Sequence, residues 1–304
     1  MPPRADGAPP SRPLREALFT GLERLLSFTI ERLDWRGAQS FGRAIGGFGW
    51  TFARRDRRRT LEHLSIAFPE RTVAERVRLG RASFRHFGAM LAECLWLRSR
   101  GSEELSRRVE IVGWEEVERL RSDGRPILMV SAHCGNWEML HAAVNARGLG
   151  MAVVVREVEE GVLQSLLQDL RTRFGTPTIL RGTRSAGRAL LRSIRSGGAL
   201  GIMLDQDTNV DGVWVSFFGK PAWTAVGAAE IAARGNVGTL PAFIERRPDG
   251  SHRLSIAPEL ELPADRVAAT QAMTACIEEQ IRRVPEQWVW MHRRWRRQPE
   301  TGES

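Results

Sequence analysis

The stretch Pro126-Ile-Leu-Met-Val-Ser131-Ala-His133-Cys-Gly-Asn-Trp-Glu138 is the most informative part of the sequence for the fold. Its first half is a short apolar run after a glycine-containing turn, and such a run indicates a buried strand. Gly135 permits a further turn, and Asn136 can then cap a following helix. A buried strand that passes through a polar turn into a helix is typical of an α/β domain.

The rest of the chain continues this alternation. Similar apolar runs indicate strands at residues 151–155, 199–204 and 237–244. Helical patterns lie between them and beyond them, at residues 136–147, 161–174, 184–196, 224–234 and about 264–283. A capping box at Thr72 and Glu75 predicts the beginning of a long helix that ends near Leu97. We therefore expect an α/β fold with a central, largely parallel sheet flanked by helices.

The N-terminal region differs in composition from this domain. We expect residues 1–13, rich in Pro, Gly and Ala, to form a disordered arm, and residues 298–304 to form a loose tail. Residues 14–33 have a helical apolar stripe but too many charges to span a membrane. An aromatic segment at 41–52 precedes an arginine cluster at 54–59. Residues 14–60 are thus either a membrane-associating amphipathic segment or a pair of helices packed on the domain formed by 61–297.

The charge of the chain restricts its partners. Among 304 residues, 45 Lys and Arg outnumber 36 Asp and Glu, for a net charge of +9, and Lys220 is the single lysine. Such a chain should attract nucleic acid, anionic lipid surfaces or an acidic carrier protein, although codon bias can account for part of the arginine excess. Its three cysteines form no CxxC pair, which argues against a Cys-rich zinc site and a disulfide framework.

The junction after the first strand carries the candidate chemistry. His133 and Glu138 would not share a face of a continuous helix, but a turn at Gly135 lets them meet. A carboxylate beside an imidazole fixes its tautomer, and the other ring nitrogen can then act as a general base. The backbone N–H groups of the following helix could stabilise an oxyanion. A purely structural histidine and a nucleophilic Cys134 thiol remain alternatives, and we expect no metal site.

Three later segments hold further candidates. Asp205 and Asp207 follow the strand at 199–204, so they emerge at a second strand end, where they could also serve as turn caps. The run 213–219 includes Phe217 and Phe218, which could line a slot for an alkyl chain or belong to the core. Residues 286–297 interleave tryptophan with arginine, a pattern that also fits a solvated face with cation–π pairs.

In this order, the segments resemble the lysophospholipid acyltransferase superfamily, and in particular the lipid A biosynthesis late acyltransferases, over roughly residues 54–299. The His-x4-Asp/Glu motif of that family is matched by His133, Gly135, Asn136, Trp137 and Glu138. Its Asp-x-Asp and Phe-Phe-Gly segments are matched by Asp205, Asp207, Phe217, Phe218 and Gly219. Its C-terminal motif is matched by Pro285, Glu286, Gln287, Trp288, Trp290, His292, Arg293 and Arg294, and its arginine after the second strand by Arg156. The chain departs from the family pattern at His63, where an asparagine is usual, and in the N-terminal segment.

The resemblance implies a glycerolipid-acyltransferase-like fold and an acyltransferase without a cofactor. The enzyme would move a fatty acyl group from acyl carrier protein or acyl-CoA to a glycolipid hydroxyl, with a lipid A precursor as acceptor, or else a phosphoinositide mannoside or lysophospholipid. His133 would deprotonate this hydroxyl with Glu138 as its orienting partner. The remaining candidates are Arg156 and Asn136 for the oxyanion or substrate, together with Arg184, Arg188, Asp205 and Asp207, and then Trp137, Phe217 and Phe218 for the acyl chain or the core.

The same resemblance places the enzyme on the cytoplasmic face of the bacterial inner membrane, as a peripheral or monotopic protein on an anionic surface. Two classes of protein compete with this interpretation. A thioesterase could use the same residues on water, and would consume acyl thioester without an acceptor lipid. A nucleic-acid-binding protein would explain the charge, but it would leave the junction after the first strand unexplained. We therefore expect no nucleic acid partner.

Overall fold

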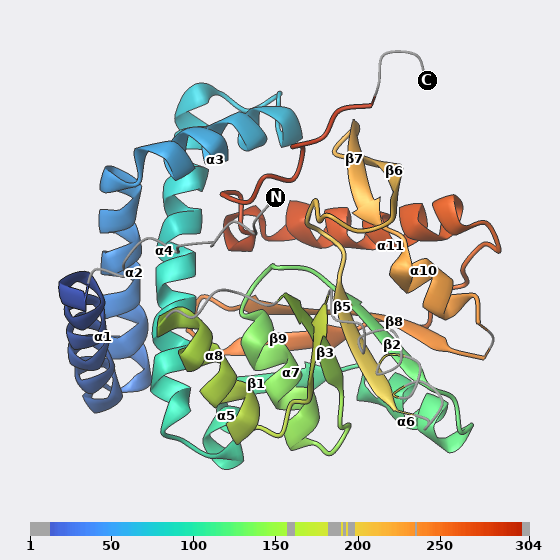
Figure 1. Ribbon diagram of the computed structural model, residues 1–304, viewed down its shortest axis with the longest axis horizontal. Helices are drawn as coiled ribbons and strands as arrows, with labels where there is room; N and C mark the ends of the chain where they lie inside the picture. Colours follow the sequence, from blue (N-terminus) through green and yellow to red (C-terminus); the bar gives the residue numbers. More distant parts are fainter. Residues whose placement is uncertain are drawn as a thin grey trace, which may run out of the picture.

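The computed structural model describes residues 13–156, 162–181, 190, 193, 198–234 and 236–299. A seven-stranded sheet in the order β1-β9-β8-β2-β5-β3-β4 forms its centre (Figure 1). Neighbouring strands are parallel, except that β8 and β9 are antiparallel. The strands are β1 (Val109–Val112), β2 (Ile127–Ser131), β3 (Ala152–Arg156), β4 (Thr178–Arg181), β5 (Ala199–Met203), β8 (Gly238–Arg246) and β9 (His252–Ile256). The predicted α/β fold with a largely parallel sheet is confirmed.

Helices surround this sheet, and a separate hairpin of β6 (Gly212–Phe217) and β7 (Lys220–Ala225) packs against α11 (Figure 1). The helices are α1 (Pro13–Arg32), α2 (Trp35–Phe52), α3 (Arg54–Ala67), α4 (Val73–Arg98), α5 (Ser102–Arg108), α6 (Trp114–Ser122), α7 (Trp137–Ala146), α8 (Val162–Arg173), α10 (Gly227–Ala232) and α11 (Arg266–Arg283), followed by a short 3-10 turn, η1 (Pro285–Gln287). None of the helices in these described ranges has the length and hydropathy needed to cross a bilayer.

Most of the predicted helices are present, and one needs correction. The capping box at Thr72 is confirmed, because its side chain accepts from the backbone N–H of Glu75 while the Glu75 carboxylate accepts from that of Thr72. The helix predicted at 224–234 is wrong at its start, since Thr224 pairs with Val213 in the β6–β7 hairpin. The predicted helix at 184–196 lies almost entirely outside the described residues, as do most of the predicted arm and tail.

Strand β2 lies at the centre of the core. All five of its residues are buried, and alternate side chains face opposite sides of the sheet. Ile127 and Met129 join a cluster with residues of α4, α7 and α8, whereas Leu128 and Val130 join a second cluster with Phe217 and Trp288. Burial on both faces explains why this strand is a continuous apolar run rather than an alternating one.

The N-terminal helices pack on the outer side of α4. Figure 1 shows α2 alongside α4, with α1 beside the lower half of α2, and Glu31 of α1 pairs with Arg98 at the C-terminal end of α4. Gly42 and Gly46 of α2 lie directly against the backbone of α4 at Gly88 and Phe84, where any Cβ would overlap a carbonyl oxygen. Such close backbone contact requires glycine. Residues 35–52 therefore pack on the domain through one face, while Ile45, Phe48 and Phe52 are exposed.

Candidate active site

His133 lies just beyond the carboxyl end of β2, beside the carboxyl end of β5. Because the two strands are parallel neighbours, residues that follow them meet at one edge of the sheet. Asp205, which follows β5, therefore contacts His133. Its Oδ1 lies 2.8 Å from His133 Nδ1, and its Oδ2 accepts from the His133 backbone N–H at 2.9 Å.

The environment of Asp205 keeps its carboxylate ionised. The side chain is buried, and Trp288 Nε1 donates to its Oδ2 at 2.7 Å. Burial alone would raise the pKa of Asp205, but the charge and hydrogen bonds of His133 and the bond from Trp288 outweigh it and lower the pKa to about 2. An ionised carboxylate can only accept, so His133 Nδ1 must carry its hydrogen.

This arrangement leaves the second ring nitrogen of His133 available. In the part of the chain that the structure describes, His133 Nε2 has no hydrogen-bond partner, and its side chain is 20% exposed. The ring of Trp137 packs edge-on against the imidazole, with 5.0 Å between the ring centres. An imidazole held at Nδ1 by a buried carboxylate, with no partner on Nε2 among the described residues, has the arrangement of a general base.

Glu138 does not contact His133, so the predicted pairing is corrected. Its buried carboxylate accepts from His141 Nε2 at 2.8 Å and from Arg171 Nη2 and Nε at 2.6 and 3.0 Å. Burial would raise the pKa of Glu138, but His141 and Arg171 outweigh it and lower the pKa to about 2. Glu138 is the second residue of α7, and its ion pair with Arg171 of α8 joins the two helices.

The turn between His133 and α7 has a fixed geometry. Gly135 has φ +70°, and a Cβ there would overlap the carbonyl oxygen of Ile244, so this position requires glycine. Asn136 is fully buried and caps α7, with its Oδ1 accepting from the backbone N–H of Met139 at 3.2 Å. Asn136 therefore shapes the turn, and its side chain has no exposed surface.

The C-terminal segment packs against the same turn. The Gly135 backbone N–H donates to the Gln287 carbonyl at 2.9 Å, and the Val289 N–H donates to the His133 carbonyl at 3.3 Å. Phe217 and Phe218, which were candidates for the acyl chain or for the core, are 0% and 6% exposed and pack against tryptophans of this segment. The structure places both in the core, where Phe217 packs against Trp288 and Phe218 against Trp290.

Four candidates remain, and only one of them is fully described. Asp207 binds the C-terminal arginines, with Arg296 Nη2 at 3.0 Å and the backbone N–H of Arg297 at 3.1 Å. Arg156 ends β3 at the same edge of the sheet as His133, but its side chain lies outside the described part of the chain. The other two arginine candidates, Arg184 and Arg188, lie outside the described residues altogether.

Two further side chains bear on the chemistry. Cys134 is buried, and burial raises the pKa of its thiol, so a nucleophilic thiolate is disfavoured. His292 is partly buried near Asp205 and His133, and its Nδ1 has no partner among the described residues. Burial lowers the pKa of His292 to about 4, so it is neutral near pH 7. His292 belongs to the C-terminal motif matched in the sequence.

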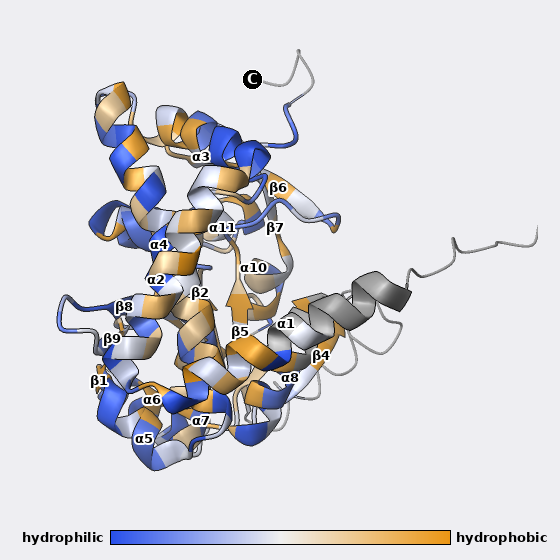
Figure 2. Ribbon diagram, turned by 90° about the vertical axis from the view of Figure 1, so that its left-hand side faces the viewer, coloured by the Kyte–Doolittle hydropathy of each residue, from blue (hydrophilic) through white to orange (hydrophobic). Residues whose placement is uncertain are grey.

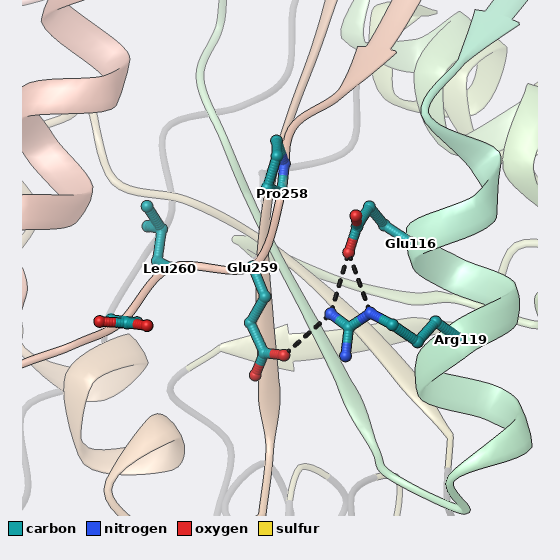
Figure 3. A pocket seen from close by; sticks show the side chains of 6 residues that line it. Glu116, Arg119, Pro258, Glu259 and Leu260 are labelled. Atoms are coloured by element: carbon teal, nitrogen blue, oxygen red, sulfur yellow. Dashed lines mark hydrogen bonds and ion pairs between the residues drawn. The ribbon is translucent and has the colours of Figure 1, made fainter.

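A surface hollow of about 480 Å³ lies far from this edge of the sheet. Figure 3 shows Arg119 between Glu116 and Glu259, to which it donates at 2.9 and 3.0 Å. The adjoining Leu260 bonds to Thr239 at the amino end of β8, opposite the edge that carries His133. Arg119, Glu116 and Glu259 are paired with one another, so this hollow is lined by a surface cluster of ion pairs.

Comparisons with known proteins converge on one group. Residues 25–297 match the sequence model of the bacterial lipid A biosynthesis acyltransferase family. The lipid A biosynthesis palmitoleoyltransferase of Escherichia coli K12 is 26% identical over 273 residues, 86% of each chain. The lauroyltransferase of the same organism is 25% identical over 279 residues, 89% of each chain. A phosphatidylinositol mannoside acyltransferase of Mycobacterium tuberculosis is 26% identical over 222 residues, 70% of this chain and 69% of its own.

Proposed function

Because the chain belongs to the bacterial lipid A biosynthesis acyltransferase family and is therefore an acyltransferase, we propose that it moves a fatty acyl group from an acyl thioester to a hydroxyl of a lipid A precursor. The observation that carries the proposal is the contact of 2.8 Å between His133 Nδ1 and Asp205. This pair sits at the carboxyl edge of the sheet, where α/β enzymes bind their ligands. It leaves His133 Nε2 as the reacting atom.

The reaction needs one proton acceptor and no covalent enzyme intermediate. His133 Nε2 takes the proton of the acceptor hydroxyl while its oxygen attacks the thioester carbonyl carbon. Asp205, buried and ionised, stabilises the imidazolium that forms. The tetrahedral intermediate then expels the thiolate as the carbon–sulfur bond breaks, and the thiolate recovers the proton from His133. The products are an ester and a free thiol.

The first turn of α7 is suited to stabilise the oxyanion. As the first helical residues, Trp137 and Glu138 have backbone N–H groups without intrahelical partners. These groups follow His133 directly and add the positive end of the helix dipole. Arg156, at the end of β3, is a second candidate donor at the same edge of the sheet. We propose that at least one of these groups binds the developing negative charge.

The donor and acceptor are testable together by mass spectrometry. Purified full-length protein is incubated with lauroyl, myristoyl and palmitoleoyl thioesters of acyl carrier protein or coenzyme A. Each donor is offered a lipid A precursor, a phosphatidylinositol mannoside, a lysophospholipid or no acceptor. We expect acylated lipid A precursor with the wild type and none with His133→Ala. The mycobacterial relative makes the mannoside the second candidate acceptor. Thioester hydrolysis at equal rate without any lipid would refute acyl transfer.

We further propose that the N-terminal helices dock on an anionic membrane, at the cytoplasmic face of the inner membrane. Large apolar side chains are exposed on α1 and α2, at Leu25, Phe28, Ile45, Phe48 and Phe52. Figure 2 shows orange, hydrophobic turns on α2 close to blue, hydrophilic ones on α3. The Phe48 and Phe52 rings lie 4.2 Å apart, beside four arginines of α3 that line a hollow of about 640 Å³, Arg54, Arg55, Arg57 and Arg58. Apolar insertion next to a basic cluster favours anionic lipid.

Vesicle flotation tests this docking. We expect the wild type to float with vesicles that contain anionic lipid and to remain in solution with neutral vesicles. The variant Phe48→Ser/Phe52→Ser should lose flotation, whereas Val267→Ser, at an exposed apolar residue of α11, should keep it. Equal flotation of the two variants would contradict the assignment of the membrane-binding surface. That outcome would not contradict the proposed acyl transfer, because the transfer is measured separately with detergent-dispersed lipid.

A further inference from the structure

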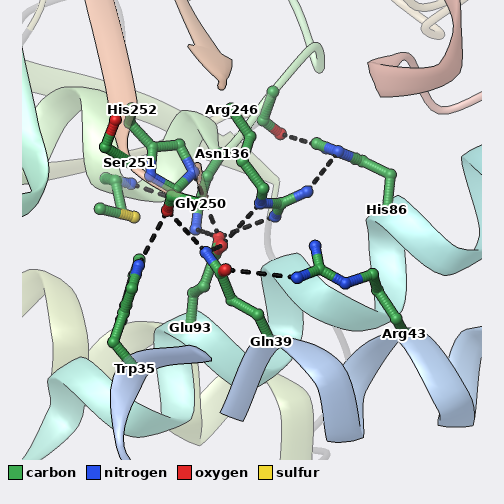
Figure 4. A network of polar contacts seen from close by, with 12 residues as sticks. Trp35, Gln39, Arg43, His86, Glu93, Asn136, Arg246, Gly250, Ser251 and His252 are labelled. Atoms are coloured by element: carbon green, nitrogen blue, oxygen red, sulfur yellow. Dashed lines mark hydrogen bonds and ion pairs between the residues drawn. The ribbon is translucent and has the colours of Figure 1, made fainter. Parts of the chain in front are cut away.

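Beneath the His133 turn lies a buried charged network that the proposed chemistry does not use (Figure 4). We propose that Glu93 and Arg246 are positioning residues, which hold this turn so that His133 Nε2 meets the substrate. The inference rests on the proposed function, because it assumes that His133 is the base. It goes further by assigning a role to residues that touch neither His133 nor any group of the reaction.

Glu93 is the centre of the network. It lies on α4 with no exposed surface, and it accepts from Arg246 Nε at 2.7 Å and from Arg246 Nη2 at 2.8 Å. Gln39 of α2 donates to the same carboxylate at 2.6 Å, and a ring nitrogen of His252 lies 3.4 Å away. Burial would raise the pKa of Glu93, but Arg246 and His252 outweigh it, so the pKa is well below its ordinary value.

Two hydrogen-bonded connections link this ion pair to adjacent residues of the turn. The first is direct, since the Asn136 amide donates to Glu93 Oε2 at 2.9 Å while its oxygen caps α7. The second passes through His86, whose Nδ1 lies 2.6 Å from Arg246 Nη1 and whose Nε2 lies 3.3 Å from the carbonyl oxygen of Gly135. A guanidinium can only donate, so His86 Nδ1 accepts and Nε2 donates to Gly135.

The backbone of Arg246 reinforces this geometry. The Gln287 side chain accepts from its N–H at 2.8 Å and donates to its carbonyl at 2.9 Å, and the Gln287 carbonyl accepts from the N–H of Gly135. Gly135 and Asn136 are therefore held through side chains on one side and through backbone on the other. A buried ion pair is a weak source of net stability, and so a role in fixing the position of the turn is the better explanation for it.

The test separates stability from position by removing both charges together. Arg246→Met alone leaves Glu93 buried without a counterion and should be unstable. The double variant Glu93→Gln/Arg246→Met has no unpaired charge, so it should be more stable than Arg246→Met. The variant still lacks the hydrogen bond from residue 246 to His86, which connects the network to Gly135. We expect its kcat to fall on the order of 10²-fold, as for other small misplacements of a catalytic group, with an unchanged KM for the thioester.

A matched control removes a second ion pair at the other end of β2. Arg125 donates to Glu259 at 2.9 Å near the amino edge of the sheet, so Glu259→Gln/Arg125→Met should keep wild-type kcat. Recovery of wild-type kcat in the Glu93/Arg246 double variant would overturn the inference, because the network would then be structural alone. Activity of His133→Ala would instead overturn the proposed function, so the two failures are distinguishable.

A second pair of variants applies if the double variant does not fold. His86→Gln can still accept from Arg246 and donate to Gly135, whereas His86→Leu can do neither. Both leave the ion pair of Glu93 and Arg246 in place. We expect His86→Leu to lose at least about tenfold in kcat and His86→Gln to retain most of it. Equal kcat in the two variants would contradict the positioning role.

Discussion

Asp205→Asn changes one atom of the pair and should disable His133. In the wild type, Asp205 Oδ2 faces two donors, the backbone N–H of His133 and Trp288 Nε1, while Oδ1 faces His133 Nδ1. The oxygen of an asparagine amide would take the position with two donors, so its NH₂ group would face Nδ1. His133 Nδ1 would then have to accept, and the ring hydrogen would move to Nε2. A base whose reacting nitrogen already carries a hydrogen cannot accept the hydroxyl proton.

The size of the effect follows from the tautomer. Exchange of the carboxylate for an amide in a comparable triad lowers kcat by about 10⁴-fold with the geometry intact. We expect a loss of about 10³- to 10⁴-fold here, equal to about 4–5.5 kcal/mol of transition-state stabilisation. The fold should persist, since asparagine has the same shape and keeps a hydrogen-bonding group at each position.

The assay is acyl transfer from a lauroyl thioester to a lipid A precursor, followed by mass spectrometry, with the melting temperature measured in parallel. Asp207→Asn is the matched control, because Asp207 is buried two residues further on but contacts Arg296 and Arg297 rather than His133. It should lose far less kcat than Asp205→Asn. Wild-type kcat in folded Asp205→Asn would refute the assignment of Asp205 as the partner of His133.

Three further changes test the structure around the site. Glu138→Gln leaves Arg171 buried without a counterion, so urea titration should show a free energy of unfolding lower by about 3–5 kcal/mol, and an unchanged value would contradict the buried pair. Gly135→Ala forces a left-handed backbone and a clash with Ile244, and should cost at least about 2 kcal/mol, which a wild-type melting curve would exclude. Because the folded-state pKa values of Glu138 and Asp205 are lowered to about 2, the unfolded state binds protons first on acidification. Stability should be complete above about pH 5 and should fall toward pH 2, less steeply in Glu138→Gln; a flat profile would count against both pairs.

The local elements of the fold were predictable from the sequence because burial leaves a readable pattern. The apolar run of β2 reflects contact with core clusters on both faces, and Thr72 and Asn136 cap their helices where polar residues precede apolar ones. The hairpin was missed at Thr224, because its pairing with Val213 depends on a partner strand rather than on local propensity.

The candidate site was predictable in its members but not in their pairing. His133 and Asp205 both follow buried strands, yet they are 72 positions apart, and the order of strands in a sheet is not written in any local pattern. The short spacing from His133 to Glu138 favoured the nearer carboxylate. Glu93 was missed as well, since its partners lie on α2, α7 and β8; a carboxylate among the apolar residues of α4 was the available signal.

The most direct test of the central proposal is the tautomer of His133, read from its ring ¹⁵N shifts by NMR in the full-length protein, with assignment by comparison to His133→Ala. The proposed mechanism predicts that the neutral ring carries its hydrogen on Nδ1, bonded to Asp205, with Nε2 free to take the hydroxyl proton. A neutral ring with its hydrogen on Nε2 would contradict it.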